Sequence, residues 1–277
     1  METKPVRDVS DTAKWVATYR AEESERRDAL FRDPLAKRVA GERGPTIARG
    51  ASKHSRWALV TRTKLIDDLV LASVREGTDC VMNLAAGFDT RPYRLELPKA
   101  LRWVEADLPA LVDEKERLLA GETARCELSR EAVDLTDPVA RSAFLARAVG
   151  GAKKTLVVTE GLVVYLAESV VEAMAEDFAR HAVHEWILDF SSPRIVADIR
   201  RDMGVLLENA PFKFAPPNGV AFFEKLGWKP RDLLSLFHAA ARLKRLPLWM
   251  RPFALIPPVD PRKLGKERWS AVVRFER

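Results

Sequence analysis

The sequence has little cysteine and little histidine, and this excludes two classes of protein. Only Cys80 and Cys126 occur among 277 residues, and they form no CxxC pair and no disulfide framework. The four histidines are scattered, and no group of His and Cys has the spacing of a metal site. We therefore expect no bound metal ion, and we expect the reducing cytoplasm as the compartment.

Long apolar runs are also missing. Apolar stretches such as 156–158 and 162–166 are far shorter than the roughly 20 residues that a membrane-spanning helix needs. The first residues read as a charged, helix-like segment and lack the apolar core of a signal peptide. From these absences we expect that the chain has no membrane span and no membrane partner.

The charge pattern lacks the marks of a nucleic-acid-binding protein. The net charge is +6 and the pI is near 9.4, which permits such a partner without requiring one. Basic residues are interspersed with acidic ones, basic runs are short, and neither a binding motif nor aromatic–basic interleaving is present. We expect a solvated, somewhat basic surface and no nucleic-acid partner.

What is present is an alternation of short apolar runs with helical patterns, in a chain long enough for one large α/β domain. Such alternation predicts a doubly wound, mostly parallel sheet with helices on both faces. The predicted strands are 80–84, 102–106, 131–135, 155–159, 186–190 and 270–275. The predicted helices are 11–40 (with a break at Asp33-Pro34), 56–76, 108–119, 141–149 and 170–182, and 41–55 is predicted to be a loop.

The whole chain, 1–277, is interpreted as a single domain with four parts. An N-terminal helical cap (11–76) precedes a ligand-binding core (77–190). Residues 191–220 break the strand–helix rhythm, end in PPNG and carry the apolar residues Leu206, Leu207, Phe212 and Phe214. This composition favours a lid over an apolar pocket, although a helix packed on the sheet edge is the alternative. The remainder, 221–277, is expected to complete the sheet.

A small-residue turn follows the first predicted strand, in the string VMNLAAGFD at 81–89. Gly87 can adopt φ > 0 and lets a ligand approach the backbone closely. Asp107 follows twenty positions later, at the end of the next strand, where nucleotide-binding α/β folds place an acid that accepts from ribose hydroxyls. On spacing alone, a tight turn with an exposed Asp is an equal alternative. The G-x-G-x-x-G fingerprint is incomplete, because Ala85 and Thr90 replace two glycines, and this disfavours a nicotinamide cofactor.

Longer strings occur in a characteristic order. They are NLAAGFDTR at 83–91, YRL at 93–95, EADLP at 105–109 with Lys115 after it, and TEGLVVYL at 159–166. TAKW at 12–15, YRAE at 19–22 and DPLA at 33–36 precede them. In this order the chain resembles the leucine carboxyl methyltransferase family, especially the bacterial branch that includes polyketide O-methyltransferases. The resemblance runs from about residue 11 to 190, and more loosely to the end.

The resemblance implies a class I methyltransferase fold, Rossmann-like, with S-adenosylmethionine as the methyl donor. It assigns Arg62 to the donor's carboxylate, which suits a guanidinium fork, Gly87 to the space beside the donor, and Asp107 to the ribose. It also assigns Asp134 and Leu135 to the adenine, and Glu160 to the region of the donor's amino group. Ala85 departs from the glycine of the family's eukaryotic members.

Other residues of the same strings receive different interpretations. Asp89, Arg91 and Arg94 are expected to brace the loop through internal salt bridges, and Tyr165 is expected to pack. No catalytic residue is identified, because an ionised carboxylate acceptor needs no general base. If a hydroxyl acceptor requires a base, His54 or a residue of the lid is a candidate.

The expected activity is therefore methyl transfer from S-adenosylmethionine to a carboxylate or hydroxyl of a small molecule. Methylation of a protein's C-terminal carboxylate is an alternative. A nicotinamide-dependent oxidoreductase and a non-catalytic donor-binding protein are less favoured, and the oligomeric state is left open.

Overall fold

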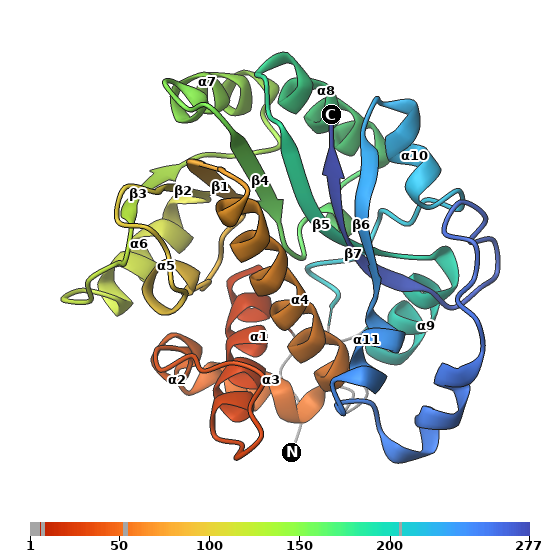
Figure 1. Ribbon diagram of the computed structural model, residues 1–277. Helices are drawn as coiled ribbons and strands as arrows, with labels where there is room; N and C mark the ends of the chain where they lie inside the picture. The colour runs from red at the N-terminus through yellow and green to blue at the C-terminus, as the bar shows by residue number, and fades with distance from the viewer. Residues whose placement is uncertain (1–5, 7–8, 52–54, 205–206) are drawn as a thin grey trace.

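The computed structural model describes residues 6, 9–51, 55–204 and 207–277. These residues form one seven-stranded sheet in the order β3-β2-β1-β4-β5-β7-β6 (Figure 1). The strands are β1 (Cys80–Leu84), β2 (Arg102–Asp107), β3 (Glu127–Ala132), β4 (Thr155–Thr159), β5 (Glu185–Ser191), β6 (Lys229–Ser235) and β7 (Ser270–Glu276). The neighbours from β3 to β5 pair in parallel, whereas β7 pairs antiparallel with both β5 and β6. The expectation of a mostly parallel α/β sheet is confirmed.

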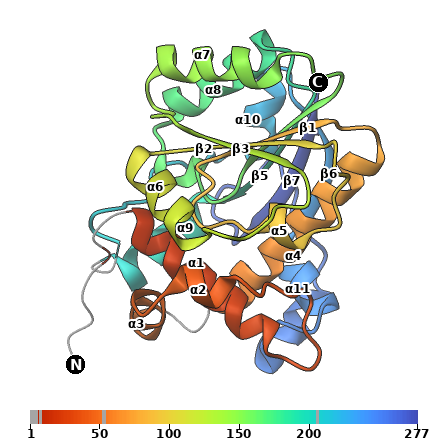
Figure 2. The same ribbon diagram turned by 90° about the vertical axis from the view of Figure 1, so that its left-hand side faces the viewer.

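Helices cover both faces of this sheet, as Figures 1 and 2 show. Long α4 (Ser55–Arg75) and α11 (Leu236–Arg242) pack on the face that carries Val81 and Trp103. On the opposite face, α7 (Pro138–Val149), α8 (Glu168–Arg180) and α10 (Val220–Lys225) pack against Met82 and Trp186. Alternate residues of one strand thus enter two separate cores, as the two-residue period of a strand requires. Beyond α4, the chain also forms α5 (Arg91–Arg94), α6 (Pro109–Leu118) and α9 (Pro193–Met203), with 3-10 turns η1 (Val163–Tyr165) and η2 (Leu248–Leu255).

The N-terminal helices lie below the carboxyl ends of the parallel strands in Figure 1. They are α1 (Val9–Ser24), α2 (Ala36–Ala40) and α3 (Arg43–Gly50). The prediction of a loop over 41–55 was wrong for 43–50, which is helical and buries Ile47 against Trp15, while residues 52–54 lie outside the described residues. Gly44 permits this packing, since a Cβ there would collide with the Thr18 hydroxyl and the Lys14 carbonyl oxygen of α1. Gly44 therefore marks a close approach between α3 and α1, and it does not indicate a flexible loop.

Two edge strands differ from the sequence prediction. The third strand is Glu127–Ala132 and not 131–135, because Val133 and Leu135 are buried in the loop after the strand and imitate a strand pattern. Strand β6 was not predicted at all. Both β3 and β6 lie at an edge of the sheet and carry mainly polar residues, so hydrophobic periodicity does not reveal them.

The 191–220 segment contains a helix and then irregular chain. Helix α9 begins at a Ser192 cap and Pro193, and the backbone amides of Lys213 and Phe214 donate to the Val164 carbonyl oxygen at 2.6 and 3.1 Å. Leu206 lies outside the described residues. Among the described residues, no helix is both long and apolar enough to cross a bilayer, and no cluster of ligating side chains could hold a metal ion.

Candidate active site

A cavity of about 740 Å³ opens at the carboxyl ends of the parallel strands. Such an edge is where open α/β sheets bind their ligands, because the loops that leave neighbouring strands diverge there. The sequence-predicted residues Arg62, Gly87, Asp107, Asp134, Leu135 and Glu160 all line this one cavity. Arg62 comes from α4, and the other five lie at or after the ends of four adjacent strands, so the sheet order brings those five together.

The turn after β1 approaches the end of β2. Ala85 and Gly87 both have positive φ, +53° and +45°, and the Gly87 N–H donates to Oδ2 of Asp107 at 2.6 Å. The second oxygen, Oδ1, accepts from the Leu108 N–H at 2.8 Å. Ala85 thus adopts the left-handed backbone conformation that glycine would adopt, so the replacement of the glycine by Ala85 leaves a positive φ in this turn.

Asp107 is buried, with 8% of its surface exposed, yet it lines the cavity. Burial raises the pKa of its carboxyl, although the hydrogen bonds from Gly87 and Leu108 oppose the shift. Among the described residues, no Lys or Arg forms an ion pair with it. A buried carboxylate with two backbone donors and no cation has lone pairs left for a ligand's hydroxyl groups.

Asp134 and Leu135 follow β3 on the next part of the wall. Oδ1 of Asp134 accepts from the backbone N–H and the hydroxyl of Thr136, at 2.9 and 2.7 Å. These hydrogen bonds from Thr136 lower the pKa of the Asp134 carboxyl. Leu135 is 7% exposed and presents apolar surface beside it. The pair therefore offers one acceptor and one apolar contact to the same ligand group.

Arg62 lies between two carboxylates on the far side of the cavity. Its Nε donates to Oε1 of Glu160 at 3.0 Å, and its Nη1 donates to Oδ2 of Asp189 at 3.1 Å. Burial disfavours the charged forms, but the opposite charges outweigh it, so the pKa of Arg62 is raised and that of Glu160 is lowered. Among the described residues, Nη2 of Arg62 has no acceptor. Arg62 and Glu160 are therefore both ionised at neutral pH, with one edge of the guanidinium left over.

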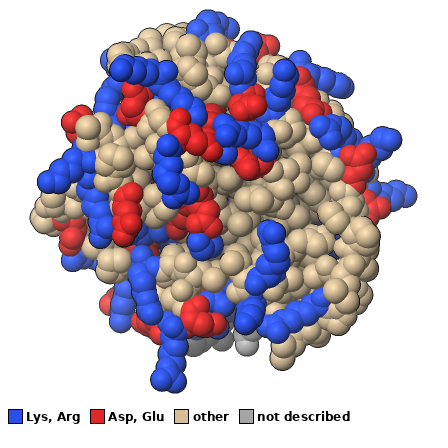
Figure 3. Space-filling model, in the orientation of Figure 1, with Lys and Arg blue, Asp and Glu red and all other residues tan. Residues whose placement is uncertain are grey.

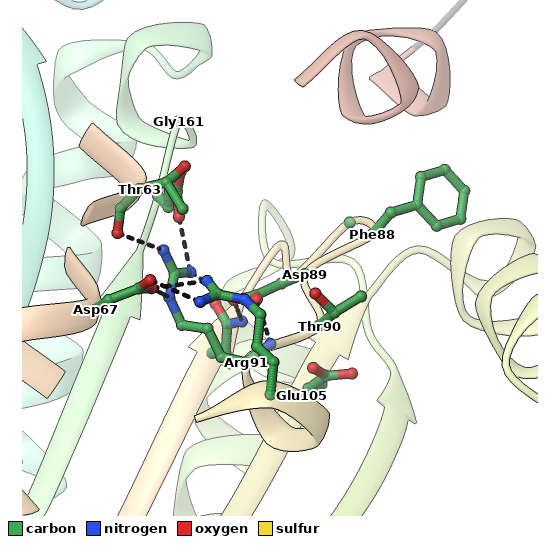
Figure 4. A network of polar contacts seen from close by, with 12 residues as sticks. Thr63, Asp67, Phe88, Asp89, Thr90, Arg91, Glu105 and Gly161 are labelled. Carbon is green, nitrogen blue, oxygen red and sulfur yellow. Dashed lines mark hydrogen bonds and ion pairs between the residues drawn. The ribbon is translucent and has the colours of Figure 1, made fainter. Parts of the chain in front are cut away.

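Beneath this triad lies a buried network centred on Arg91, which Figure 4 shows from close by. Arg91 contacts Asp89 at 2.6 Å, Asp67 at 2.7 Å and Glu160 at 2.8 Å, and Arg94 contacts Asp67 at 2.6 Å. The Asn83 side chain also donates to Asp89 at 2.8 Å. The prediction that Asp89, Arg91 and Arg94 brace the loop is confirmed. The network joins α4, the turn after β1 and the end of β4 into one rigid base for the cavity.

The other end of the cavity is apolar and is built by α1, α4, α9 and the chain after α9. The Tyr165 ring packs edge-on against Phe212 with centroids 5.1 Å apart, and both line the cavity. Tyr165 therefore packs, as expected, and also contributes to the wall. Burial raises the pKa of its hydroxyl, which keeps it neutral. Apolar side chains that line this end include Trp15, Trp57, Leu59, Ile195, Ile199, Met203 and Leu207.

Some site residues were missed or misplaced by the sequence analysis. Asp189 was missed, although an acid inside the apolar run of β5 was a signal for it, since a buried carboxylate needs a partner. Phe214 was grouped with Phe212, but it is 2% exposed and packs against Phe222 and Phe223 away from the cavity wall. The candidate base His54 lies outside the described residues.

Comparison with known proteins adds a family to this geometry. A model of the family described as leucine carboxyl methyltransferase matches residues 13–179. A Streptomyces coelicolor protein that carries the provisional name S-adenosyl-L-methionine-dependent methyltransferase is 39% identical over 175 residues, which cover 59% of this chain and 62% of that protein. A provisionally named relative from Mycobacteroides abscessus is 32% identical over 192 residues, covering 64% of each chain. The matched region thus spans about three fifths of these relatives' length.

Solved structures support the fold. A provisional methyltransferase from Thermobifida fusca superimposes with a TM-score of 0.60 at 15% identity, covering 99% of this chain and 96% of the other. A DUF574 family protein from Streptomyces avermitilis gives 0.59 at 12% identity, with 94% and 96% covered. The family model covers the turn after β1, Asp107, the 134–135 pair and Glu160, which are the segments that build the polar end of the cavity. The chain belongs to the leucine carboxyl methyltransferase family.

Proposed function

We propose that this protein transfers the methyl group of S-adenosylmethionine to an oxygen atom of a small, largely apolar molecule. One observation carries the proposal: a single cavity of about 740 Å³ is lined both by the six residues assigned to the donor and by a set of large apolar side chains. Family membership and relatives named as S-adenosyl-L-methionine-dependent methyltransferases support it.

The polar end suits the donor group by group. Asp107 accepts from the ribose hydroxyls, while Gly87, which lacks a side chain, leaves room for the donor beside it. Asp134 accepts from the adenine amino group and Leu135 packs on the ring. Asp107 and Asp134 form no ion pair within the described chain, so this end carries unbalanced negative charge. A ligand with a sulfonium and an ammonium group, and one carboxylate, carries a net charge of +1 and so reduces that imbalance.

Arg62 and Glu160 hold the donor's amino-acid portion in this proposal. Nη2 of Arg62 is available to a ligand carboxylate, while Glu160 and Asp189 keep the guanidinium in place through its other nitrogens. Glu160, which stays ionised, lies near the ligand's ammonium group. The free protein thus holds Arg62 in a fixed orientation before the donor arrives, which limits the entropy lost on binding.

The reaction needs alignment more than acid–base chemistry. The sulfonium donor supplies an activated methyl group, so the acceptor oxygen forms a bond to carbon while the C–S electron pair remains on sulfur. The chain's contribution is to hold both molecules in one cavity and to exclude water with the apolar wall. An acceptor carboxylate has no proton to lose, whereas a hydroxyl releases its proton to water or to a nearby carboxylate.

The apolar end favours a small molecule over a protein terminus. Its wall includes Trp15, Trp57, Met203 and Phe212, whose only polar groups are the Trp N–H groups, while Asp198, Asp202 and Arg268 are charged residues that line the same cavity. Burying unpaired peptide groups there would be costly. The same argument disfavours a nucleic-acid acceptor.

We extend the proposal to the organisation of the chain. Residues 11–76 act as a cap over the donor core of 77–190, 191–220 acts as a lid over the acceptor, and 221–277 completes one domain. The two cysteines are unpaired in the described chain, which suits the cytoplasm as the working compartment.

Calorimetry with S-adenosylhomocysteine tests the donor assignment directly. We expect binding in the micromolar range, about −7 to −9 kcal/mol. NADH is the control. Binding of NADH, without binding of S-adenosylhomocysteine or S-adenosylmethionine, would refute the proposal. A screen of hydroxylated and carboxylated apolar compounds with methyl-labelled donor then identifies the acceptor, with product located on oxygen by mass spectrometry.

A further inference from the structure

The surface beyond α11 carries a cluster of exposed apolar side chains that the proposed reaction does not use. The cluster, here called the apolar patch, consists of Leu248, Trp249, Phe253, Leu255 and Ile256, with exposed fractions from 55% to 88%. Large apolar residues are exposed elsewhere in the described chain only at Leu108 and Val139. Single exposed residues need no explanation, but a contiguous patch marks an interaction surface.

The chain holds this patch in place. The backbone carbonyl oxygen of Ile256 accepts from Nε2 of His238, at 3.1 Å, which ties the end of the patch to α11. At its start Leu246 is buried, and the neighbouring Arg245 pairs with Glu23 at 2.6 Å. The apolar side chains are therefore exposed on an anchored segment, and their exposure does not result from a loose loop.

The charged residues of the segment that carries the patch are of one sign, although the exposed Asp28 contacts Arg245 beside it at 3.1 Å. From 233 to 259 the sequence has no Asp or Glu, while it has Arg242, Lys244, Arg245 and Arg251. Arg242, Lys244 and Arg251 are exposed, and no carboxylate in the described part of the chain pairs with them. In Figure 3 the lower right of the surface, where α11 and the following segment lie in Figure 1, shows basic residues and residues without formal charge, but no acidic ones.

We propose that the apolar patch docks the protein on an anionic membrane surface. Exposed Trp, Phe and Leu beside unpaired Lys and Arg are the composition of an interfacial anchor, in which apolar groups enter the headgroup region and cations meet acidic lipids. A second copy of the chain is a poorer occupant, because a two-fold contact would bring the basic residues of both copies together. The sequence analysis excluded a membrane partner from the lack of a spanning run, and that absence does not bear on surface docking.

Docking here would place the cavity beside the membrane. Leu236 of α11 lines the cavity, and the Trp57 ring, which also lines it, packs edge-on against Phe237 of α11 at 6.2 Å. The patch and the cavity thus lie on opposite sides of one short helix. An apolar acceptor dissolved in the bilayer would then have a short path to the apolar end of the cavity. The docking itself does not depend on the proposed reaction.

Vesicle co-sedimentation tests the inference without any substrate. The full chain should bind vesicles of phosphatidylcholine that contain phosphatidylglycerol at least tenfold more tightly than vesicles of phosphatidylcholine alone. Raising the salt from about 0.1 M to about 0.5 M should weaken binding severalfold, since it screens the basic residues. The Leu248→Asp/Leu255→Asp variant should lose at least tenfold in binding, and Arg242→Gln/Lys244→Gln should lose the preference for acidic lipid.

Val139→Asp is the matched control, because Val139 is 77% exposed on α7 and far from the patch in the fold. It should bind vesicles as the wild type does. Failure of the wild type to bind acidic vesicles, or equal binding by the Leu248→Asp/Leu255→Asp variant with an unchanged melting temperature, would overturn the inference. A dimer in light scattering that this variant dissociates would instead assign the patch to self-association and would also overturn it.

Discussion

The backbone N–H of Gly87 donates to Oδ2 of Asp107 at 2.6 Å, which joins the turn after β1 to the end of β2 at the cavity wall. The contact occupies one lone pair of the carboxylate and fixes its plane, because Leu108 N–H holds the other oxygen. Asp107 is thus oriented before a ligand arrives.

Asp107→Ala should weaken S-adenosylhomocysteine binding by about 1.5–3 kcal/mol, since hydrogen bonds to a charged acceptor are lost. Calorimetry measures the change. Asp113→Ala is the control, because Asp113 is exposed on the following helix α6. Equal affinities for wild type and Asp107→Ala would remove Asp107 from the ribose site.

Arg62→Lys should weaken donor binding nearly as much as Arg62→Ala, because an ammonium group cannot contact Glu160, Asp189 and a ligand carboxylate with fixed planar geometry. Arg62→Ala should in addition destabilise the free protein by about 1–3 kcal/mol, since it leaves two carboxylates without their shared cation. Urea unfolding and calorimetry separate the two effects. Arg56→Ala, on the same helix but more exposed, should change neither quantity.

Acid should destabilise the protein through Asp89. Burial disfavours its ionised form, yet Arg91, Lys115 and Arg94 hold the pKa of its carboxyl well below the ordinary 3.8. A carboxyl whose folded-state pKa is lowered contributes stability that is complete above its unfolded pKa and lost as the pH falls below it. Asp89→Asn should therefore cost about 2–4 kcal/mol at pH 7, and the difference from wild type should shrink below pH 4. Unfolding free energies measured across this range test the sign, and a constant difference would contradict it.

Phe212 and Phe214 provide a matched pair for the lid. Phe214→Ala should cost about 3–5 kcal/mol of stability, because it empties a buried position against Phe222 and Phe223. Phe212→Ala should spare stability and donor affinity but change the KM or range of acceptors, since this ring lines the apolar end of the cavity. Steady-state kinetics on an identified acceptor checks this, and unchanged kinetics would assign 207–214 to the scaffold.

Ala85→Gly should stabilise the protein by about 0.5–1 kcal/mol, because Ala85 has a φ of +53° that costs an L side chain about 1–2 kcal/mol and glycine less. Thermal unfolding measures this, and donor affinity should not fall. A lower melting temperature would show that the Ala85 methyl group contributes packing that outweighs its backbone strain.

The sequence predicts the central sheet well, because β1 and β4 are mainly apolar and every residue in them is buried. It predicts the edge strands poorly, because β3 reads ELSREA and β6 reads KPRDLLS, and their pairing depends on neighbours distant in the chain. The prediction of helix α3 fails for a related reason. The close contact with α1 requires a glycine at position 44, whereas the local composition around Gly44 is typical of a loop.

The six candidate donor residues were assigned through the family resemblance, and only Gly87, Asp107 and Glu160 of them stand within the strings that carry it. Their gathering at one cavity follows from the parallel strand order, which alternation already indicated. The link between Arg62 and Glu160 across 98 positions, and the place of Asp189 in it, could not be read from any local pattern. Asp189 comes close to Glu160 because β5 pairs with β4.

The strand order has a consequence for synthesis on the ribosome. Strand β7 comes after β6 in the chain but lies between β5 and β6, and its residues from Ala271 to Phe275 are buried. While the chain emerges, β5 has an open edge and β6 has no place to pair until β7 leaves the exit tunnel. Nascent chains paused before residue 270 should therefore present the unpaired edge of β5 to chaperones, and a stop codon there would remove β7 and leave β6 without its partner strand.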